Sequence, residues 1–352
     1  MLAPALEVPI QNGTGSIPTV GLGTWTVFGE QGNADEVEKA CLAAIDAGYR
    51  HIDCAWCYGT QPGVGRALEA KIREGVITRE DMFITTKLWD THHNPSLVSE
   101  ELKDSLTTLR TDYVDLFLIH WPLALQDQDM SGKPIAPLDA DGKGIPAEHA
   151  LEDVWKVRRR FVRKTEIHAS RKFCRKNRTM PAMEECHRAG LTRNIGLSNF
   201  NKKQVDRIMK ICTIKPSNMQ VEVSPYFSNS RILDHCRQLG MTLTAYAPLG
   251  APNRPWRETG EPNVFEDPVL KEIATVKRKT TAQVILRFHI QRGLVVIPKS
   301  IRTSRIQENI QIFDFTLTDD EMSKIAALDK NLRVFKESIG FNHKEYPFNE
   351  PF

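Results

Sequence analysis

Four residues that can bind or release protons stand at the ends of short apolar runs: Asp53, Tyr58, Lys87 and His120. The runs HIDCAWCY, MFITTKLW and VDLFLIHW are each typical of a β-strand. A carboxylate can pair with a lysine, a lysine can lower the pKa of a tyrosine, and an imidazole can orient a carbonyl group. The set predicts a site that donates a proton to a carbonyl oxygen. The alternative is a structural ion pair between Asp53 and Lys87, with Tyr58 only packing beside it.

The positions of these residues depend on a pattern of alternating strands and helices, which is typical of a parallel sheet wound with helices. Eight segments have the composition of strands: 19–24, 50–54, 82–89, 114–120, 193–199, 218–223, 242–248 and 295–300. Helix patterns between them include 34–48, which ends at Gly48, and 94–109, which begins at an Asn94 cap. Eight strands that each lead to a helix predict an α/β fold, a single (β/α)8 TIM barrel, whose strand ends share one mouth.

Both ends of the chain add elements to this barrel. Asn12-Gly13 lies between two short apolar stretches and predicts an N-terminal β-hairpin. A C-terminal helix over 318–329 and an irregular tail to Phe352 follow the eighth unit. Two long connections, 121–148 and 251–267, leave strand ends on the face where the functional loops of a barrel belong.

The bulk composition, with 352 residues, 41% hydrophobic and 26% charged, is that of an ordinary globular protein. Because no apolar run reaches about 18 residues and the start lacks a basic and apolar leader, we expect no membrane span and no secretory signal. Seven scattered cysteines favour reduced thiols in the cytoplasm over a disulfide framework.

The net charge of +3 is unevenly distributed. Residues 157–178 hold ten of the 47 basic residues and one of the 44 acidic ones. The basic balance therefore comes from one segment and does not predict nucleic-acid binding by the whole protein.

This basic segment interrupts a helix pattern. Joining residue 156 directly to residue 182 brings four apolar residues to helical spacing: Leu151, Val154, Trp155 and Met183. We interpret 157–181 as an insertion into an outer helix of one domain that spans 1–352. The segment could be a nucleic-acid or targeting patch, a solvated excursion, or translated intron sequence in a predicted gene.

Tryptophans mark a candidate pocket, because Trp25, Trp89 and Trp121 follow strand ends and Trp256 lies in a long loop. They predict the walls of a substrate site, with core packing as the alternative.

Two nearby motifs could suggest a metal or redox site. The pair His92-His93 has no companion ligands, so we expect no metal there. Cys54-Ala-Trp-Cys57 has the spacing of a redox pair but not the electropositive helix start that such a pair prefers.

A cofactor site is predicted after the last strand. Gly63-Val64-Gly65 is an incomplete dinucleotide fingerprint without a preceding strand, so a Rossmann site is unsupported. The run IPKSIRTSRIQEN instead leads from a strand into a helix start, which is a natural phosphate site. Lys299, Ser300 and Arg305, with Arg302 nearby, suit a 2′-phosphate and hence NADP over NAD. These charges could alternatively be merely solvated.

Taken together, the motifs GLGTW, AGYRHIDCAWCYG, TTKLW, DLFLIHWP, GLSNFN, QVEVSPY, TAYAPLG and IPKSIRTSRIQEN resemble those of the aldo-keto reductases. The tail YPFNEPF is similar to that of the NADP-dependent aldehyde reductases (alcohol dehydrogenase [NADP+]). The resemblance implies reduction of aldehydes and some ketones with NADPH. It implies Tyr58 as the acid that Lys87 and Asp53 tune, and His120 as the residue that orients the carbonyl. It also implies a set of cofactor contacts: Thr24, Trp25, Asp53, Ser198, Asn199, Gln220, Tyr246, Leu249, Lys299, Ser300, Arg305, Glu308 and Asn309. The implied substrate contacts are Trp25, Trp89, His120, Trp121 and Trp256.

Some residues depart from the family pattern. Ala247 and Ala251 lack the hydroxyls that would contact the pyrophosphate, and Asn253 replaces an aspartate that clasps the covering loop. The tail also lacks the arginine that aldehyde reductases use for acidic substrates, so uronates are not expected to be preferred. We expect a monomer acting on a small carbonyl compound. The alternatives are a structural or regulatory protein on a reductase barrel, like some crystallins and channel β-subunits, and an isoform inactivated by the insertion.

Overall fold

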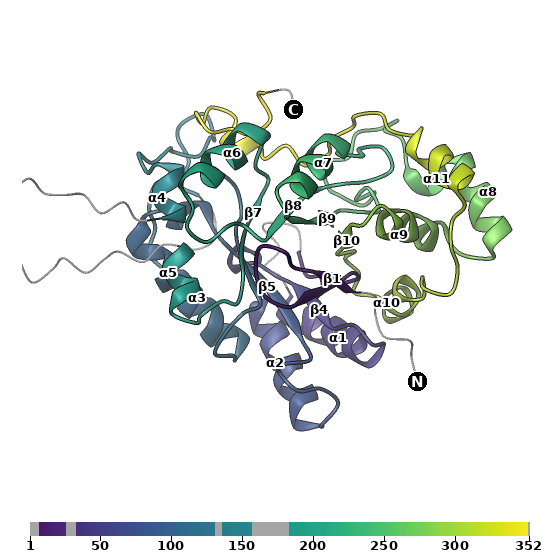
Figure 1. Ribbon diagram of the computed structural model, residues 1–352, viewed down its shortest axis with the longest axis horizontal. Coiled ribbons are helices and arrows are strands. Elements are labelled where there is room, and N and C mark those ends of the chain that lie inside the picture. The colour runs from purple at the N-terminus through teal and green to yellow at the C-terminus, as the bar shows by residue number, and fades with distance from the viewer. Residues whose placement is uncertain (1–6, 26–32, 131–135, 157–182, 351–352) are drawn as a thin grey trace, which may run out of the picture.

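The computed structural model describes residues 7–25, 33–130, 136–156 and 183–350 (Figure 1). Its centre is a parallel sheet in which each strand pairs with the next along the chain. The strands are β3 (Leu22–Gly23), β4 (His51–Asp53), β5 (Phe83–Leu88), β6 (Leu116–Ile119), β7 (Ile195–Ser198), β8 (Asn218–Glu222), β9 (Thr242–Tyr246) and β10 (Val295–Val296). Parallel bridges from Val20 to Val296 and from Gly23 to Lys299 join the last strand to the first. The predicted (β/α)8 barrel is confirmed.

Helices surround the sheet (Figure 1). They are α1 (Ala34–Asp46), α2 (Gln61–Arg73), α3 (Pro95–Leu109), α4 (Leu151–Trp155), α5 (Met183–Arg188), α6 (Lys202–Ile211), α7 (Ser230–Gln238), α8 (Pro268–Lys277), α9 (Thr281–Gln291), α10 (Thr303–Ile310) and α11 (Asp319–Ala326). The Asn94 side chain caps α3 by accepting a hydrogen bond from the Ser96 N–H. Gly48 follows α1 with a φ of 98°, as its predicted stop requires.

Several predicted strands are longer than the observed ones. The segment 19–24 contains only the two residues of β3, and 295–300 only the two of β10. Val20 and Ile297 are nevertheless buried, at 0% and 5% exposure. Pairing also continues outside the named strands as single bridges and hydrogen bonds, such as that from the Ile297 N–H to the Ala245 carbonyl oxygen at 3.3 Å, so the predicted segments cover more than the regular ladder.

The predicted N-terminal hairpin is present as β1 (Glu7–Pro9) and β2 (Ser16–Pro18), paired antiparallel. It is tied to the barrel by Asn194, whose Oδ1 accepts a hydrogen bond from the Thr14 N–H at 2.9 Å. A Cβ atom at Gly13 would lie 2.0 Å from that same oxygen, so the turn needs glycine at this position. The hairpin therefore packs at the N-terminal ends of the strands.

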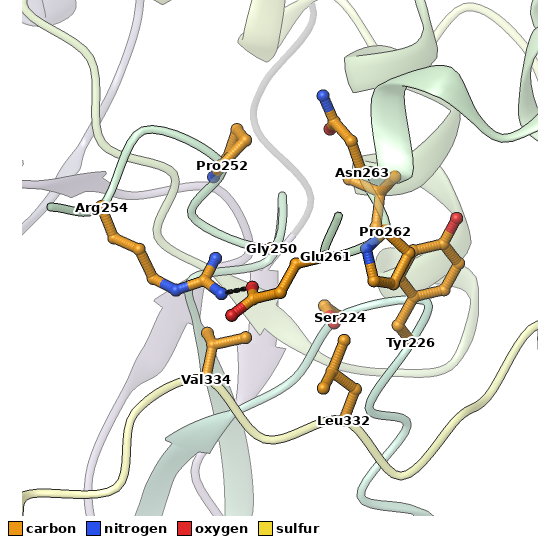
Figure 2. A pocket seen from close by; sticks show the side chains of 11 residues that line it. Ser224, Tyr226, Gly250, Pro252, Arg254, Glu261, Pro262, Asn263, Leu332 and Val334 are labelled. Carbon is orange, nitrogen blue, oxygen red and sulfur yellow. Dashed lines mark hydrogen bonds and ion pairs between the residues drawn. The ribbon is translucent and has the colours of Figure 1, made fainter. Parts of the chain in front are cut away.

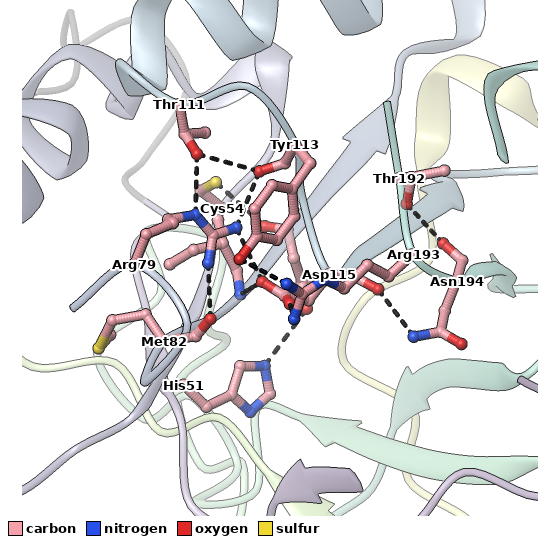
Figure 3. Close-up of polar contacts among 12 residues, drawn as sticks. His51, Cys54, Arg79, Met82, Thr111, Tyr113, Asp115, Thr192, Arg193 and Asn194 are labelled. Carbon is pink, nitrogen blue, oxygen red and sulfur yellow. Dashed lines mark hydrogen bonds and ion pairs between the residues drawn. The ribbon is translucent and has the colours of Figure 1, made fainter. Parts of the chain in front are cut away.

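A polar cluster stabilises this same end (Figure 3). Asp115, just before β6, accepts hydrogen bonds from Arg79 Nη2 at 2.8 Å and from the Ile84 N–H at 2.9 Å. Arg79 and Arg193 lie over the ring of Tyr113, with guanidinium carbons 4.0 and 4.1 Å from its centroid. These contacts join β5, β6 and β7 at the end of the barrel away from His120.

The helices on either side of the basic segment pack on the main core. Leu151, Val154, Trp155 and Met183 are all 3% exposed or less, as the joined helical stripe predicts. The insertion at 157–181 lies outside the described residues, so the single domain over 1–352 stays a prediction. Among the described helices, none is long and apolar enough to cross a membrane.

Candidate active site

The four residues first singled out converge at the C-terminal ends of neighbouring strands. Asp53 ends β4, Lys87 lies in β5, and His120 follows β6 directly. Tyr58 ends a short 3-10 helix, Trp56–Tyr58, that leaves β4. Parallel barrel strands place their last side chains around one mouth, which explains why residues up to 67 positions apart meet here.

The ammonium group of Lys87 is the centre of this cluster. Its side chain is 0% exposed, and Nζ lies 2.5 Å from Asp53 Oδ1 and 3.3 Å from the Tyr58 hydroxyl. Nζ also donates a hydrogen bond to the Cys54 carbonyl oxygen at 3.0 Å. The other carboxylate oxygen of Asp53 accepts a hydrogen bond from Gln220 Nε2 at 2.7 Å. Because both charges are paired and hydrogen-bonded, the buried ion pair is held in one geometry.

That Lys87 lowers the pKa of Tyr58 stays a prediction, because the surroundings of the phenol taken together act in the opposite direction. Burial, to which the Asp53 carboxylate adds, raises the pKa of Tyr58 well above the usual value for a phenol. Tyr58 therefore keeps its proton at neutral pH. The ammonium 3.3 Å away can still stabilise negative charge on the phenol oxygen once the proton has left.

His120 stands beside Tyr58 as a neutral imidazole. Burial, with a smaller effect from the Lys87 ammonium, lowers the pKa of His120 well below its usual value. Its ring makes edge contacts with Tyr58 and Trp89, with centroids 5.6 and 5.4 Å apart. Cys57 Sγ lies 3.5 Å from Nδ1. A neutral imidazole can donate one hydrogen bond to an oxygen without supplying a charge.

Three of the predicted tryptophans contact aromatic residues of the C-terminal tail, in two separate groups. Trp25 and Trp256 both contact Phe335, with ring centroids 5.8 and 5.4 Å apart. Trp121 contacts Phe348 at 5.8 Å. Trp89 and Trp121 are 2% and 5% exposed, whereas Trp256 is 45% exposed. The C-terminal tail thus completes an aromatic surface with the predicted tryptophans, and their contact with substrate stays a prediction.

A second group of predicted residues borders the same mouth from β7 to β9. The Tyr246 hydroxyl donates a hydrogen bond to Asn199 Oδ1 at 2.9 Å, and Asn199 Nδ2 donates to Ser198 Oγ at 3.2 Å. Thr24 Oγ1 donates to the Asp53 carbonyl oxygen at 3.0 Å. The Tyr246, Asn199 and Ser198 side chains are therefore fixed to one another, and Thr24 is fixed separately to Asp53.

Comparison with known proteins agrees with this geometry. The model of the "Aldo/keto reductase family" matches residues 19–330. The chain belongs to that family. It is 37% identical to "Aldo-keto reductase family 1 member A1" of Gallus gallus, over 98% of each chain. It is 40% identical to "Aldo-keto reductase family 1 member A1-A" of Danio rerio, over 96% of each. A solved structure, the aldose reductase from Schistosoma japonicum, matches with a TM-score of 0.80 at 38% identity, covering 96% of this chain and 97% of that one.

In this aldo-keto reductase the predicted phosphate site lies where β10 leads into α10. Lys299, Arg302 and Arg305 are exposed and form no ion pair with any residue that the structure describes. The Ser300 hydroxyl accepts a hydrogen bond from the Arg302 N–H at 3.1 Å. Asn309 is buried, and Glu308 accepts a hydrogen bond from Thr280 Oγ1 at 2.7 Å. Three cations at a helix start that have no ion-pair partner in the described part of the chain suit a phosphate group, so these residues fit NADP.

A pocket separates the loop after β9 from the C-terminal tail (Figure 2). Arg254 on the loop forms an ion pair with Glu261, while its buried Nε has no hydrogen-bond partner among the described residues. Leu249 is partly buried at the start of this loop. Ala247 and Ala251 both have positive φ angles, 46° and 43°. The two positions that lack hydroxyls therefore also lie in backbone conformations that cost alanine some free energy.

Sequence reasoning missed three residues at this mouth. Glu222 on β8 accepts hydrogen bonds from the Val334 and Phe335 N–H groups at 2.8 and 2.9 Å, which fixes the tail across the barrel. Phe335 supplies the aromatic contacts described above. Cys57 directly precedes Tyr58 in the sequence, which was a usable signal that its thiol lies at the site. Both Cys54 and Cys57 are free thiols, so they do not form the disulfide of a redox pair.

Proposed function

We propose that this protein reduces aldehydes, and some ketones, to alcohols with NADPH, and that Tyr58 supplies the proton. The observation that carries the proposal is the buried connection from Asp53 through Lys87 to the Tyr58 hydroxyl, at 2.5 and 3.3 Å. Membership of the aldo-keto reductase family and the similarity to member A1 proteins support an oxidoreductase that acts on carbonyl compounds.

NADPH would be held at two ends. Lys299, Ser300 and Arg305 would bind the 2′-phosphate, with Glu308 and Asn309 near the adenine. Ser198, Asn199 and Gln220 would hold the carboxamide at the other end, with Tyr246 against the nicotinamide ring. Thr24, Trp25 and Leu249 would line the path between them. The bound cofactor supplies the hydride for the carbonyl carbon, and the protein supplies orientation and electrostatics.

The side chains of this chain then divide the remaining work. Tyr58 donates its hydroxyl proton to the carbonyl oxygen, forming the O–H bond of the alcohol as the phenol O–H bond breaks. Lys87 stabilises the resulting phenolate, and Asp53 holds Lys87 in place. His120 donates a hydrogen bond to the same carbonyl oxygen and so orients the carbonyl group. Trp25, Trp89, Trp121 and Trp256 would exclude water around the substrate.

The test is the variant Tyr58→Phe, assayed by NADPH oxidation with p-nitrobenzaldehyde. We expect it to lose nearly all turnover while it still binds NADPH, measured by quenching of protein fluorescence. Tyr113→Phe is the matched control, because that tyrosine lies at the opposite end of the barrel and should leave turnover unchanged. Near-normal turnover by Tyr58→Phe would reject the assignment of the proton donor.

Each alternative function has its own test. A structural or regulatory protein on this barrel would not oxidise NADPH with any aldehyde, sugar, ketosteroid or uronate in a panel. An isoform inactivated by its insertion would gain activity and thermal stability when 157–181 is deleted. Peptide mass spectrometry of the natural protein would establish whether that segment is present. A cytoplasmic monomer is part of the proposal, and cell fractionation and light scattering test it.

A further inference from the structure

The thiol of Cys57 makes a contact within the proposed site that the mechanism above does not use. Its Sγ lies 3.5 Å from Nδ1 of His120, and both residues are buried, at 2% and 8% exposure. Cys57 precedes Tyr58 directly, within the 3-10 helix that carries the proton donor. Among the described residues, this thiol provides the one hydrogen-bonding contact to the His120 ring.

The rest of the surroundings fix where His120 lies but not which ring atom faces the substrate. The backbone N–H of His120 donates a hydrogen bond to the Leu88 carbonyl oxygen at 3.1 Å. Its backbone carbonyl oxygen accepts a hydrogen bond from Asn199 Nδ2 at 3.1 Å. Tyr58 and Trp89 pack on the ring edgewise. A ring rotated by 180° has nearly the same shape but exchanges Nδ1 with Cδ2 and Nε2 with Cε1. Apolar packing does not distinguish these two orientations.

The contact with Cys57 does distinguish them. In the observed orientation Nδ1 faces Sγ, and Nε2 is directed away from the thiol. After a rotation of 180°, the Cδ2–H group would face Sγ and the Cε1–H group would stand where Nε2 was. Direction of donation matters too, because a neutral imidazole carries one proton and accepts at its other nitrogen. Burial, reinforced by the carboxylates of Asp90 and Glu101, raises the pKa of the Cys57 thiol well above its usual value, so it remains S–H. A thiol that keeps its proton can donate to Nδ1 and leave the ring proton on Nε2.

We propose that Cys57 is a positioning residue that donates its S–H to His120 Nδ1 and thereby presents an Nε2–H group to the carbonyl oxygen of the substrate. The proposal rests on the function proposed above, since it assigns that oxygen as the group His120 contacts. Without the thiol, the ring can rotate or carry its proton on Nδ1, and both changes remove the donor from the reacting oxygen.

The decisive measurement is the ¹⁵N spectrum of protein labelled in its histidine rings, with His120 assigned by the loss of its signals in His120→Gln. In the wild-type protein we expect a protonated Nε2 and an unprotonated Nδ1. In Cys57→Val and in the smaller Cys57→Ala, we expect mixed tautomers. A wild-type spectrum with the proton on Nδ1 would overturn the proposal. This readout needs no turnover, so it stands apart from any failure of the proposed reaction.

Kinetics give the second readout. A weak hydrogen bond from a thiol corresponds to roughly a two- to fivefold change in rate. We expect Cys57→Val and Cys57→Ala to lower kcat/KM for p-nitrobenzaldehyde by about that factor, with the KM for NADPH unchanged. Cys57→Ser keeps a donor and should restore both the tautomer and the rate. Cys236→Val replaces a buried cysteine on α7, remote from the site, and should change neither. Unchanged tautomer and rate in both Cys57→Val and Cys57→Ala would refute the positioning role.

Discussion

Replacing Lys87 with methionine tests how the proposed proton donor works. Lys87→Met keeps the length of the side chain but removes the ammonium that lies 3.3 Å from the Tyr58 hydroxyl. At an effective dielectric constant of about 20, an ammonium and a phenolate at this distance attract by about 5 kcal/mol. Because the phenolate forms only as the proton leaves, this energy stabilises the transition state and not the resting enzyme. The loss corresponds to a fall in kcat of roughly 10³- to 10⁴-fold.

The assay is single-turnover oxidation of bound NADPH in Lys87→Met, Tyr58→Phe and the double variant. If Lys87 acts through the phenol, the double variant should be no slower than Tyr58→Phe alone. Removing Lys87 also leaves the buried Asp53 carboxylate without its counter-ion, at a cost of about 3–5 kcal/mol of folding free energy. Lys87→Met combined with Asp53→Asn keeps the test valid if the single variant unfolds. A folded Lys87→Met enzyme within tenfold of wild-type kcat would refute the reasoning.

Three further predictions concern parts of the molecule beyond this pair. Trp155→Ala should lower the free energy of unfolding by about 3–5 kcal/mol in urea titrations, because this side chain is 0% exposed and donates to the Ile214 carbonyl oxygen. Arg305→Ala should raise the KM for NADPH by roughly tenfold with little effect on NADH, because it removes one charged donor to the 2′-phosphate; equal effects on both cofactors would contradict that site. Burial raises the pKa of Glu337 to about 7, so the folded state binds this proton more tightly than the unfolded state. The free energy of unfolding should therefore fall as pH rises from about 4.5 to about 7. In thermal melts over this range, Glu337→Gln should reduce the dependence of the melting temperature on pH.

The sequence by itself determined the barrel and its reactive residues. Alternation of apolar runs with amphipathic helices is a local property, and it placed all eight strands of the sheet. Because parallel strands end at one face, the position of Asp53, Lys87 and His120 at strand ends was enough to predict that they meet. Their meeting at 2.5 Å for the ion pair agrees with that expectation.

Tertiary structure alone decided the electrostatics and the closure of the site. The sequence predicted that a lysine acts on the tyrosine, but it did not report the depth of burial, which raises the pKa of Tyr58. Glu222 holds Val334 and Phe335 across a separation of more than a hundred residues, and the Cys57 contact depends on the rotation of a single ring. Such contacts follow from the assembled packing of distant segments, whereas strand and helix patterns follow from neighbouring residues, and this is why only the latter could be predicted in advance.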